Sequence, residues 1–312
     1  MIKEINSEDE IIKLTQLLTN NPHNPDVYFD RGLAYLNTEQ YSLAVKDFSK
    51  AIELEPEEPY FYVCRGYAWQ DFGKLAKAIK DFSKAIELAP DDADIYISRG
   101  VVYGKLGMYR EDIRDCNRAV ALEPENASHH RELGMAYYDA GQIAKSMTSL
   151  SKACELDPQN PRYLYNLGAA YVEMGQFTTA IEHLSKAIIM EPLNPDLYSE
   201  RSTAYYDMGN SKAALEDLAT CLRLEPDNAR FYQNRAFIRE SIRDREGALK
   251  DYDKAIQLDP NNEGCINARE RMINNKGFLE TLFSIFPPSL NPYKGTGKED
   301  GQNQNKNHND PE

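Results

Sequence analysis

Residues 59–92 read PYFYVCRGYAWQDFGKLAKAIKDFSKAIELAPDD, and this stretch decides the fold because its pattern recurs along the chain. Proline returns every 34 residues, without insertion or deletion, at Pro22, Pro56, Pro90, Pro124, Pro158, Pro192, Pro226 and Pro260. A fixed period of this length is typical of a solenoid, in which one small supersecondary unit is stacked many times. The period predicts seven repeats, at 25–58, 59–92, 93–126, 127–160, 161–194, 195–228 and 229–262.

Small and large residues alternate at fixed positions of each repeat. The eighth position is small, as Gly32, Gly66, Gly100, Gly134, Gly168, Ser202 and Ala236. The eleventh is aromatic in the first six repeats, as Tyr35, Trp69, Tyr103, Tyr137, Tyr171 and Tyr205, and is Arg239 in the last. Small residues let two helix backbones approach closely while aromatic rings fill the space between layers. Each repeat is therefore predicted to be a pair of antiparallel helices.

This pattern of Trp, Gly, Tyr, Ala, Phe, Ala and Pro resembles the tetratricopeptide repeat. The likeness covers about three quarters of the chain. It implies an all-α, right-handed superhelical α-solenoid of antiparallel helix pairs. It also implies a concave groove that binds an extended peptide or a helix of a partner protein.

Residues at the helix ends agree with this division. Asn24, Asp92, Asn126, Asn160, Asn194 and Asn228 stand where a side-chain oxygen caps the next helix, whereas Glu58 is expected to be a poor cap. Gly73, Gly107, Gly141, Gly175 and Gly209 end the first helix of repeats two to six, because glycine tolerates the left-handed turn. Glu39 and Arg243 take the place of that glycine in the outer repeats, where altered or frayed turns are expected.

The seventh position of each repeat changes together with a position sixteen residues later. Five repeats have Arg and Asp, at Arg31 and Asp47, Arg65 and Asp81, Arg99 and Asp115, Arg201 and Asp217, and Arg235 and Asp251. Repeats four and five instead have Leu133 with Ser149 and Leu167 with His183. We expect five ion pairs, each joining the two helices of one repeat. Inheritance from two ancestral repeat types would also explain the correlation.

The two ends of the chain are predicted to cap the stack. Residues 1–24 form half a repeat with Leu14, Leu17 and Leu18 in phase, and residues 263–288 form a charged capping helix followed by an apolar segment, Phe278–Phe286. That segment is expected to fold back on the last repeat, with partner binding, self-association and membrane contact as alternatives. Residues 289–312 lack apolar periodicity and are expected to be disordered.

Composition favours a protein-binding function in the cytoplasm. The net charge of −14 disfavours nucleic acid and anionic membranes as partners. No signal peptide or membrane-spanning stretch is evident, so a cytoplasmic location is expected. Five cysteines in no CxxC spacing are expected to be free thiols.

No pattern of catalytic residues is present in the sequence, which predicts a protein that is not an enzyme. Phosphate-loop, HExxH and GxSxG motifs are missing, and no cofactor is expected. The adjacent His129 and His130 are the one candidate metal pair, but neighbouring side chains on a helix diverge by about 100 degrees. A metal site is therefore not expected.

The expected binding surface lies on the first helices of the repeats. Its predicted members are Phe29, Leu33, Val63, Tyr67, Ile97, Val101, Arg131, Met135, Tyr138, Arg162, Tyr165, Asn166 and Asn234. The first six are apolar or aromatic and form a hydrophobic strip; the others are mostly polar or aromatic, residue types that make peptide hot spots. Tight curvature or the chain's own terminus could instead close the strip.

Two further functions remain open. Some relatives are co-chaperones that bind the carboxylate at the C-terminus of a chaperone through Lys, Arg and Asn. The nearest frame here, Arg131, Met135, Asn166, Asp196 and Glu200, does not match, because two acids would repel a carboxylate. A self-assembling scaffold joined through Phe278–Phe286 is the other alternative. We expect a monomer or a weak homo-oligomer.

Overall fold

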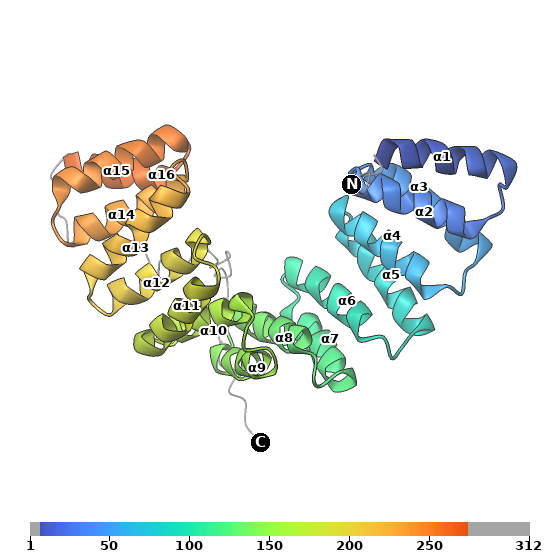
Figure 1. Ribbon diagram of the computed structural model, residues 1–312, viewed down its shortest axis with the longest axis horizontal. Coiled ribbons are helices and arrows are strands. Elements are labelled where there is room, and N and C mark those ends of the chain that lie inside the picture. The colour runs from blue at the N-terminus through green and yellow to red at the C-terminus, as the bar shows by residue number, and fades with distance from the viewer. Residues whose placement is uncertain (1–6, 274–312) are drawn as a thin grey trace, which may run out of the picture. The chain divides into compact units, whose positions relative to one another are not determined.

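The computed structural model describes residues 7–273, and within that range the chain forms helices and loops without a strand (Figure 1). The chain divides into two compact units, Met1–Met174 and Gly175–Glu312. The first contains α1 (Ser7–Asn20), α2 (Pro25–Asn37), α3 (Tyr41–Leu54), α4 (Pro59–Asp71), α5 (Leu75–Leu88), α6 (Ala93–Lys105), α7 (Tyr109–Leu122), α8 (Ala127–Asp139), α9 (Ile143–Leu156) and α10 (Pro161–Glu173). The second contains α11 (Phe177–Met190), α12 (Pro195–Asp207), α13 (Ser211–Leu224), α14 (Ala229–Ser241), α15 (Arg245–Leu258) and α16 (Glu263–Ile273).

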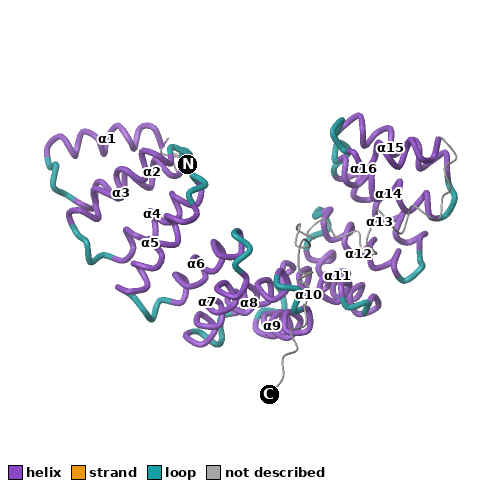
Figure 2. The backbone as a smooth tube through the Cα atoms, turned by 180° about the vertical axis from the view of Figure 1, so that it is seen from behind, coloured by secondary structure: helices purple, strands orange, loops and turns teal. Residues whose placement is uncertain are grey.

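Helices pack in sequential order within each compact unit, joined by short loops (Figure 2). The two helices of one repeat pack against each other, as α2 with α3 and α4 with α5, and the second helix then packs on the first helix of the next repeat. The same order holds for α12 with α13 and α14 with α15. The prediction of an all-α solenoid built from antiparallel helix pairs is confirmed.

Glycine at the eighth position is required by the packing of the paired helices. A Cβ on Gly32 would lie 2.6 Å from Phe48 Cε1, and one on Gly134 would lie 2.6 Å from Leu150 Cγ. Phe48 and Leu150 are completely buried. A larger eighth residue would therefore displace a core side chain, which explains why this position is small.

Side-chain caps begin the first helices as expected, with one correction. Asn24 accepts a hydrogen bond from the backbone N–H of Val27, and the other predicted Asn and Asp caps do the same at their own helices. Glu58 also caps its helix, because its Oε1 accepts from the N–H of Tyr60 at 3.2 Å. The expectation that Glu58 caps poorly is wrong, since its longer side chain reaches the same donors.

The turns at Glu39 and Arg243 keep the regular geometry. Glu39 has φ 60° and Arg243 has φ 67°, close to the 72° of Gly73. The N–H that follows each of them bonds back to the first helix, at 2.8 Å after Glu39 and 2.9 Å after Arg243. The expectation of altered or frayed turns is wrong. Both residues hold the left-handed conformation that glycine adopts more easily.

Five Arg and Asp side chains are paired across the helices of their repeats. The shortest N to O distances are 2.6 Å for Arg31 and Asp47 and 2.7 Å for Arg65 with Asp81, Arg99 with Asp115, Arg201 with Asp217 and Arg235 with Asp251. Hydrogen bonding to Asp47 raises the pKa of Arg31. All five arginines also lie beside tyrosine rings, as Arg31 does between Tyr28 and Tyr35.

A third hydrogen bond connects most of these arginines to the preceding helix, which the sequence analysis did not anticipate. Nη1 donates to a hydroxyl sixteen residues earlier, as Arg31 to Thr15, Arg65 to Ser49, Arg99 to Ser83 and Arg201 to Ser185. We call this arrangement the arginine ladder. Arg235 has Ala219 at that place, and Arg239 instead donates a further hydrogen bond to Asp251 at 2.7 Å.

The described ends of the stack are closed by different means. In α1, Leu14 and Leu18 are buried against α2, whereas Leu17 is 43% exposed. In α16, Cys265, Ala268 and Met272 are buried. The segment Phe278–Phe286 and residues 289–312 lie outside the described residues. None of the helices between residues 7 and 273 has the length and apolarity needed to cross a membrane.

The prediction of free thiols is confirmed. Cys64, Cys116, Cys221 and Cys265 are buried, and Cys154 is half-buried. Burial raises the pKa of Cys64 to about 12, so its thiol stays protonated and unreactive at neutral pH.

Candidate functional site

The first helices of repeats one to four form one layer of the first compact unit. α2 packs against α4, and α6 packs against α8, while the second helices form the other layer (Figure 1). The apolar residues predicted on this layer recur four residues apart on each helix, so each pair shares one helix face. Phe29, Leu33, Ile97, Val101 and Met135 are half-buried there. Tyr67 is 37% exposed, and Val63 is buried beneath the surface.

An aromatic cluster lies at the N-terminal end of this layer. The ring of Phe29 is 5.1 Å from that of Phe61, 5.5 Å from that of Tyr60 and 5.7 Å from that of Phe48. Tyr60 is 57% exposed, although the predicted site did not include it. Its aromatic side chain at the second position of the repeat was the signal available in the sequence. The buried rings of Phe48 and Phe61 hold Phe29 in place, and Tyr60 packs on Phe29 at the protein surface.

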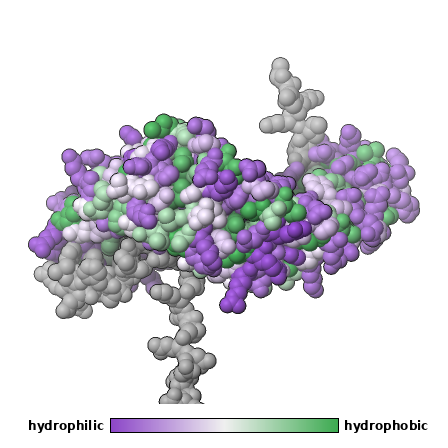
Figure 3. Space-filling view, turned by 90° about the horizontal axis from the view of Figure 1, so that it is seen from below, coloured by the Kyte–Doolittle hydropathy of each residue, from purple (hydrophilic) through white to green (hydrophobic). Residues whose placement is uncertain are grey.

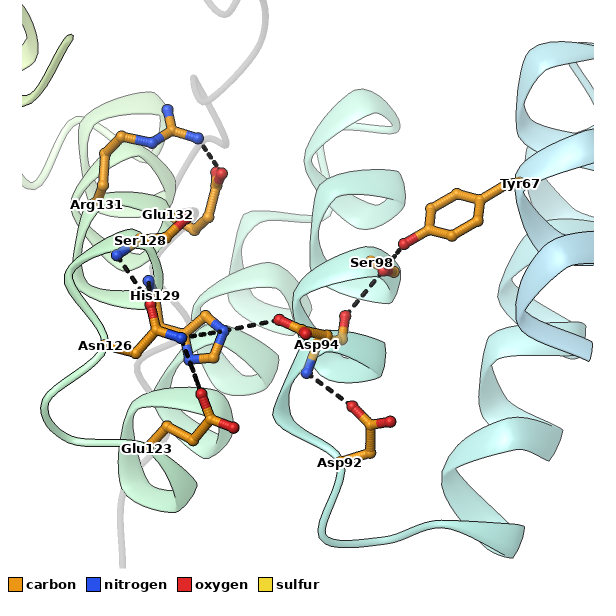
Figure 4. Close-up of polar contacts among 10 residues, drawn as sticks. All are labelled: Tyr67, Asp92, Asp94, Ser98, Glu123, Asn126, Ser128, His129, Arg131 and Glu132. Carbon is orange, nitrogen blue, oxygen red and sulfur yellow. Dashed lines mark hydrogen bonds and ion pairs between the residues drawn. The ribbon is translucent and has the colours of Figure 1, made fainter. Parts of the chain in front are cut away.

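Polar side chains connect α4, α6 and α8 beside the cluster (Figure 4). Tyr67 Oη and Ser98 Oγ are 2.5 Å apart, and Ser98 Oγ donates to the carbonyl oxygen of Asp94 at 2.8 Å. Asp94 Oδ1 lies 3.0 Å from His129 Nε2. His129 is only 2% exposed, and its Nδ1 lies 3.6 Å from Glu123 Oε2. This network fixes the spacing of three successive first helices.

The two adjacent histidines have different structural roles. His130 Nε2 lies 2.8 Å from the carbonyl oxygen of Pro124. Tyrosines at the same position of other repeats donate to the equivalent proline carbonyl, as Tyr62 does to Pro56 at 3.1 Å. His129 lies between the carboxylates of Asp94 on α6 and Glu123 in the loop after α7. Across residues 7–273, no group of three or more His, Cys, Asp or Glu side chains is arranged to hold a metal ion.

The remaining predicted residues are distributed over α8, α10 and α14. Arg131 is buried and forms an ion pair with Glu132 (Figure 4). Burial lowers the pKa of Arg131, against the effect of Glu132. On α10, Arg162 is exposed, Tyr165 is half-buried like Tyr138 on α8, and Asn166 is 9% exposed. Asn234 is buried on α14 and belongs to the second compact unit, apart from the other twelve predicted residues.

Carboxylates outnumber cationic groups around the aromatic cluster and the polar network. Asp26, Asp30, Asp94 and Asp139 are exposed on the first helices, beside the cations Lys105 and Arg162. Burial and the neighbouring Asp26 raise the pKa of Asp30. Burial of its carboxyl group also raises the pKa of Asp139, although much of that side chain stays exposed. On the face seen in Figure 3, apolar side chains emerge in separate patches among polar ones.

Family models of the tetratricopeptide repeat match the sequence between residues 25 and 263. The matched residues are 25–58, 71–107, 93–126, 134–175, 161–192 and 199–263. The chain belongs to the tetratricopeptide repeat family. No curated protein matches the sequence. Tetratricopeptide repeats generally bind other proteins and are typically non-catalytic.

Solved structures of tetratricopeptide repeat proteins share the fold. A tetratricopeptide repeat protein from Parabacteroides merdae is 19% identical with a TM-score of 0.65, over 80% of this chain and 99% of that one. A chain of the APC/C hetero-tetramer Cut9-Hcn1 is 19% identical with a TM-score of 0.62, over 86% of this chain and 53% of that one. Yeast Tom70 is 18% identical with a TM-score of 0.60, over 86% of this chain and 59% of that one. The present chain thus spans little more than half the length of the last two proteins.

Proposed function

We propose that this tetratricopeptide repeat protein is a non-enzymatic scaffold or adaptor that binds a segment of a partner protein on the first helices of its first compact unit. The observation that carries the proposal is the exposed ring of Tyr60, which packs on Phe29, a ring that itself rests on the buried Phe48 and Phe61. Rigid, partly exposed aromatic side chains are typical anchors of protein interfaces. Tyr67 on α4 and Ile97 and Val101 on α6 extend this apolar surface.

The charges on this surface favour a basic partner segment. Asp26, Asp30, Asp94 and Asp139 carry negative charge, and the cation Arg131 is already bound to Glu132. Opposite charges across an interface speed association and exclude partners of like charge. The segment we expect therefore has apolar residues for the aromatic cluster and Lys or Arg for the acidic positions. A chaperone C-terminal carboxylate would meet repulsion on the same surface.

Synthetic peptides test this proposal directly. An immobilised array would vary apolar and basic residues independently, and each sequence would be present with a free carboxyl and with an amidated C-terminus. We expect binding to basic peptides with apolar residues, in both terminal forms. Binding that requires the free carboxylate would instead support the co-chaperone function. Absence of binding to every basic peptide with apolar residues would contradict the proposal.

A matched pair of variants locates the surface. Tyr60→Ala removes the exposed ring on α4, and Tyr109→Ala removes a ring that is 37% exposed on α7, in the other layer. Truncating an aromatic anchor should weaken peptide binding by about tenfold or more. Tyr109→Ala should leave binding unchanged. Equal effects of the two variants would show that the peptide binds elsewhere.

A further inference from the structure

Repeat three departs from the other repeats at two positions that contact each other. The twentieth position is small in six repeats, as Ala44, Ala78, Ser146, Ala180, Ala214 and Ala248, but is Asp112 in repeat three. The twelfth carries a side chain in the same six, as Leu36, Gln70, Tyr138, Val172, Tyr206 and Glu240, but is Gly104 in repeat three. An acid gained and a side chain lost in the same repeat point to a local specialisation.

Asp112 projects from α7 toward the place where a side chain of residue 104 would begin. A Cβ on Gly104 would lie 2.8 Å from Asp112 Oδ2, and one on Gly100 would lie 2.9 Å from Oδ1. Asp112 is 6% exposed, whereas Gly104 itself is half-buried and reaches the surface. The carboxylate therefore lies just beneath the surface, under Gly104, which carries no side chain.

The opening at Gly104 belongs to the proposed binding surface. Ile97, Val101 and Gly104 are four and three residues apart on α6, so they lie on one helix face. On the neighbouring α8, Glu132, Met135 and Asp139 are three and four residues apart, so they also lie on one helix face. A bound segment that covers Ile97 and Val101 would consequently pass next to the Asp112 carboxylate.

Asp112 has no cationic partner among the described residues. Its Oδ1 accepts a weak hydrogen bond from Cys116 Sγ at 3.3 Å, and Oδ2 accepts none within residues 7–273. Burial, with smaller contributions from Asp139, Glu132 and Asp115, raises the pKa of Asp112 to about 7, while the Cys116 thiol opposes the rise. From α6, Gly100 and Gly104 face it, and the nearby Arg99 is bound to Asp115. A buried carboxylate without a partner is unfavourable in the unbound protein.

We propose that Gly104 and Asp112 form a pocket for a lysine side chain of the bound segment. The proposal rests on the proposed function of the surface. The missing side chain at Gly104 lets a narrow aliphatic stem approach, and the ammonium group would neutralise Asp112 while Glu132 and Asp139 line the entrance. A lysine ammonium is a compact charge on a flexible stem, whereas the guanidinium of arginine is planar and wider. The pocket should therefore favour lysine.

Binding of matched peptides to the full chain tests the pocket. A basic peptide selected from the array would be compared with versions in which each lysine is replaced by norleucine or by arginine. At one lysine we expect norleucine to weaken binding to the unmodified protein by about tenfold or more, with arginine intermediate. Asp112→Ala should weaken binding of the lysine peptide to the same degree and leave binding of the norleucine peptide unchanged. Glu87→Ala, which removes an exposed carboxylate from α5 in the other layer, is the charge control and should have little effect.

Stability separates binding from a structural role of Asp112. Because alanine is the usual residue at this position, Asp112→Ala should raise the melting temperature while it weakens binding. Gly104→Ala keeps the Asp112 carboxylate but places a methyl group in the opening. It should therefore weaken binding of the lysine peptide as well. Peptide binding that is unchanged in both variants, or a loss of binding together with a loss of stability in Asp112→Ala, would overturn the pocket and leave the proposed function intact. Failure of every array peptide to bind the unmodified protein would overturn both.

Discussion

Arg99 and Asp115 form a two-point ion pair between α6 and α7, with Nε to Oδ2 at 2.7 Å and Nη2 to Oδ1 at 2.9 Å. The Arg99 and Asp115 side chains are 13% and 2% exposed. The negative charge of the buried Asp115 is therefore balanced mainly by Arg99. Arg99 Nη1 also donates to Ser83 on α5 at 3.0 Å. The same side chain thus joins the helices of its own repeat and the repeat before it. Stability of the stack should be sensitive to this residue.

A double-mutant cycle at this pair should show strong coupling. Arg99→Leu leaves the buried Asp115 with only the exposed Arg114, whose Nε is 3.6 Å away, and should lower the free energy of unfolding by about 3 to 5 kcal/mol. The double variant Arg99→Leu with Asp115→Ser recreates the Leu133 and Ser149 of repeat four, so it should lose less than the two single losses combined. Urea unfolding measures each variant. The exposed pair Glu246 and Lys250 is the control and should show little coupling. Additive losses at Arg99 and Asp115 would contradict the contact.

Glycine at the two irregular turns should stabilise the protein. Glu39 and Arg243 hold positive φ angles, which cost a side-chain-bearing residue about 1 kcal/mol or more. Glu39→Gly and Arg243→Gly should each raise the melting temperature, because glycine adopts this conformation without strain. Ala76→Gly on the exposed side of α5 is the control, and it should lower the melting temperature through loss of helix propensity. A decrease for Glu39→Gly would mean that its side chain makes an important contact.

The buried acid Asp112 should make stability depend on pH. Its pKa is raised to about 7 in the folded protein from an ordinary value near 3.8, so the folded state retains a proton that the unfolded state releases between these values. The free energy of unfolding should therefore fall as pH rises from about 4 to 7. Asp112→Ala should remove this part of the dependence. Guanidinium unfolding at several pH values gives the slope, and an equal slope in Asp112→Ala would show that other groups cause it.

The C-terminal cap should depend on an ion pair that joins α16 to the last repeat. Arg271 on α16 donates to Glu240 Oε1 at 2.8 Å, and Glu240 also accepts from Tyr252 at 2.7 Å. The Glu240 side chain is completely buried, so Arg271→Ala should cost about 3 to 5 kcal/mol locally and expose α16 to hydrogen exchange. Arg269→Ala removes a more exposed pair with Asp253 and should have a smaller effect. Equal exchange in the two variants would indicate that Glu240 does not hold the cap.

Contacts within one repeat could be predicted well from the sequence. Gly32 faces Phe48 and Arg31 faces Asp47 because helices joined by a short turn can pack only in a few ways, and the period fixes which positions meet. The pairing of Arg with Asp was visible because both residues lie in the same repeat. The turns at Glu39 and Arg243 were misjudged, since packing of the paired helices imposes the left-handed conformation even without glycine.

Contacts between repeats and the details of the surface could not be predicted in the same way. Ser83 accepts from Arg99, and Asp94 lies against His129, across boundaries where side-chain length and rotamer decide which groups meet. Val63 and Tyr67 are one helical turn apart on the same helix, yet Val63 is buried in a hydrophobic cluster and Tyr67 is exposed.

The amino-acid sequence by itself determined the helix pairs, their register and the ion pairs inside them, because these follow from a strict period and from short-range geometry. Only the tertiary structure decided that Tyr60 is an exposed aromatic residue and that Asp112 is a buried carboxylate without a cationic partner between residues 7 and 273. Burial and charge compensation depend on atoms contributed by several helices, and no single repeat contains that information.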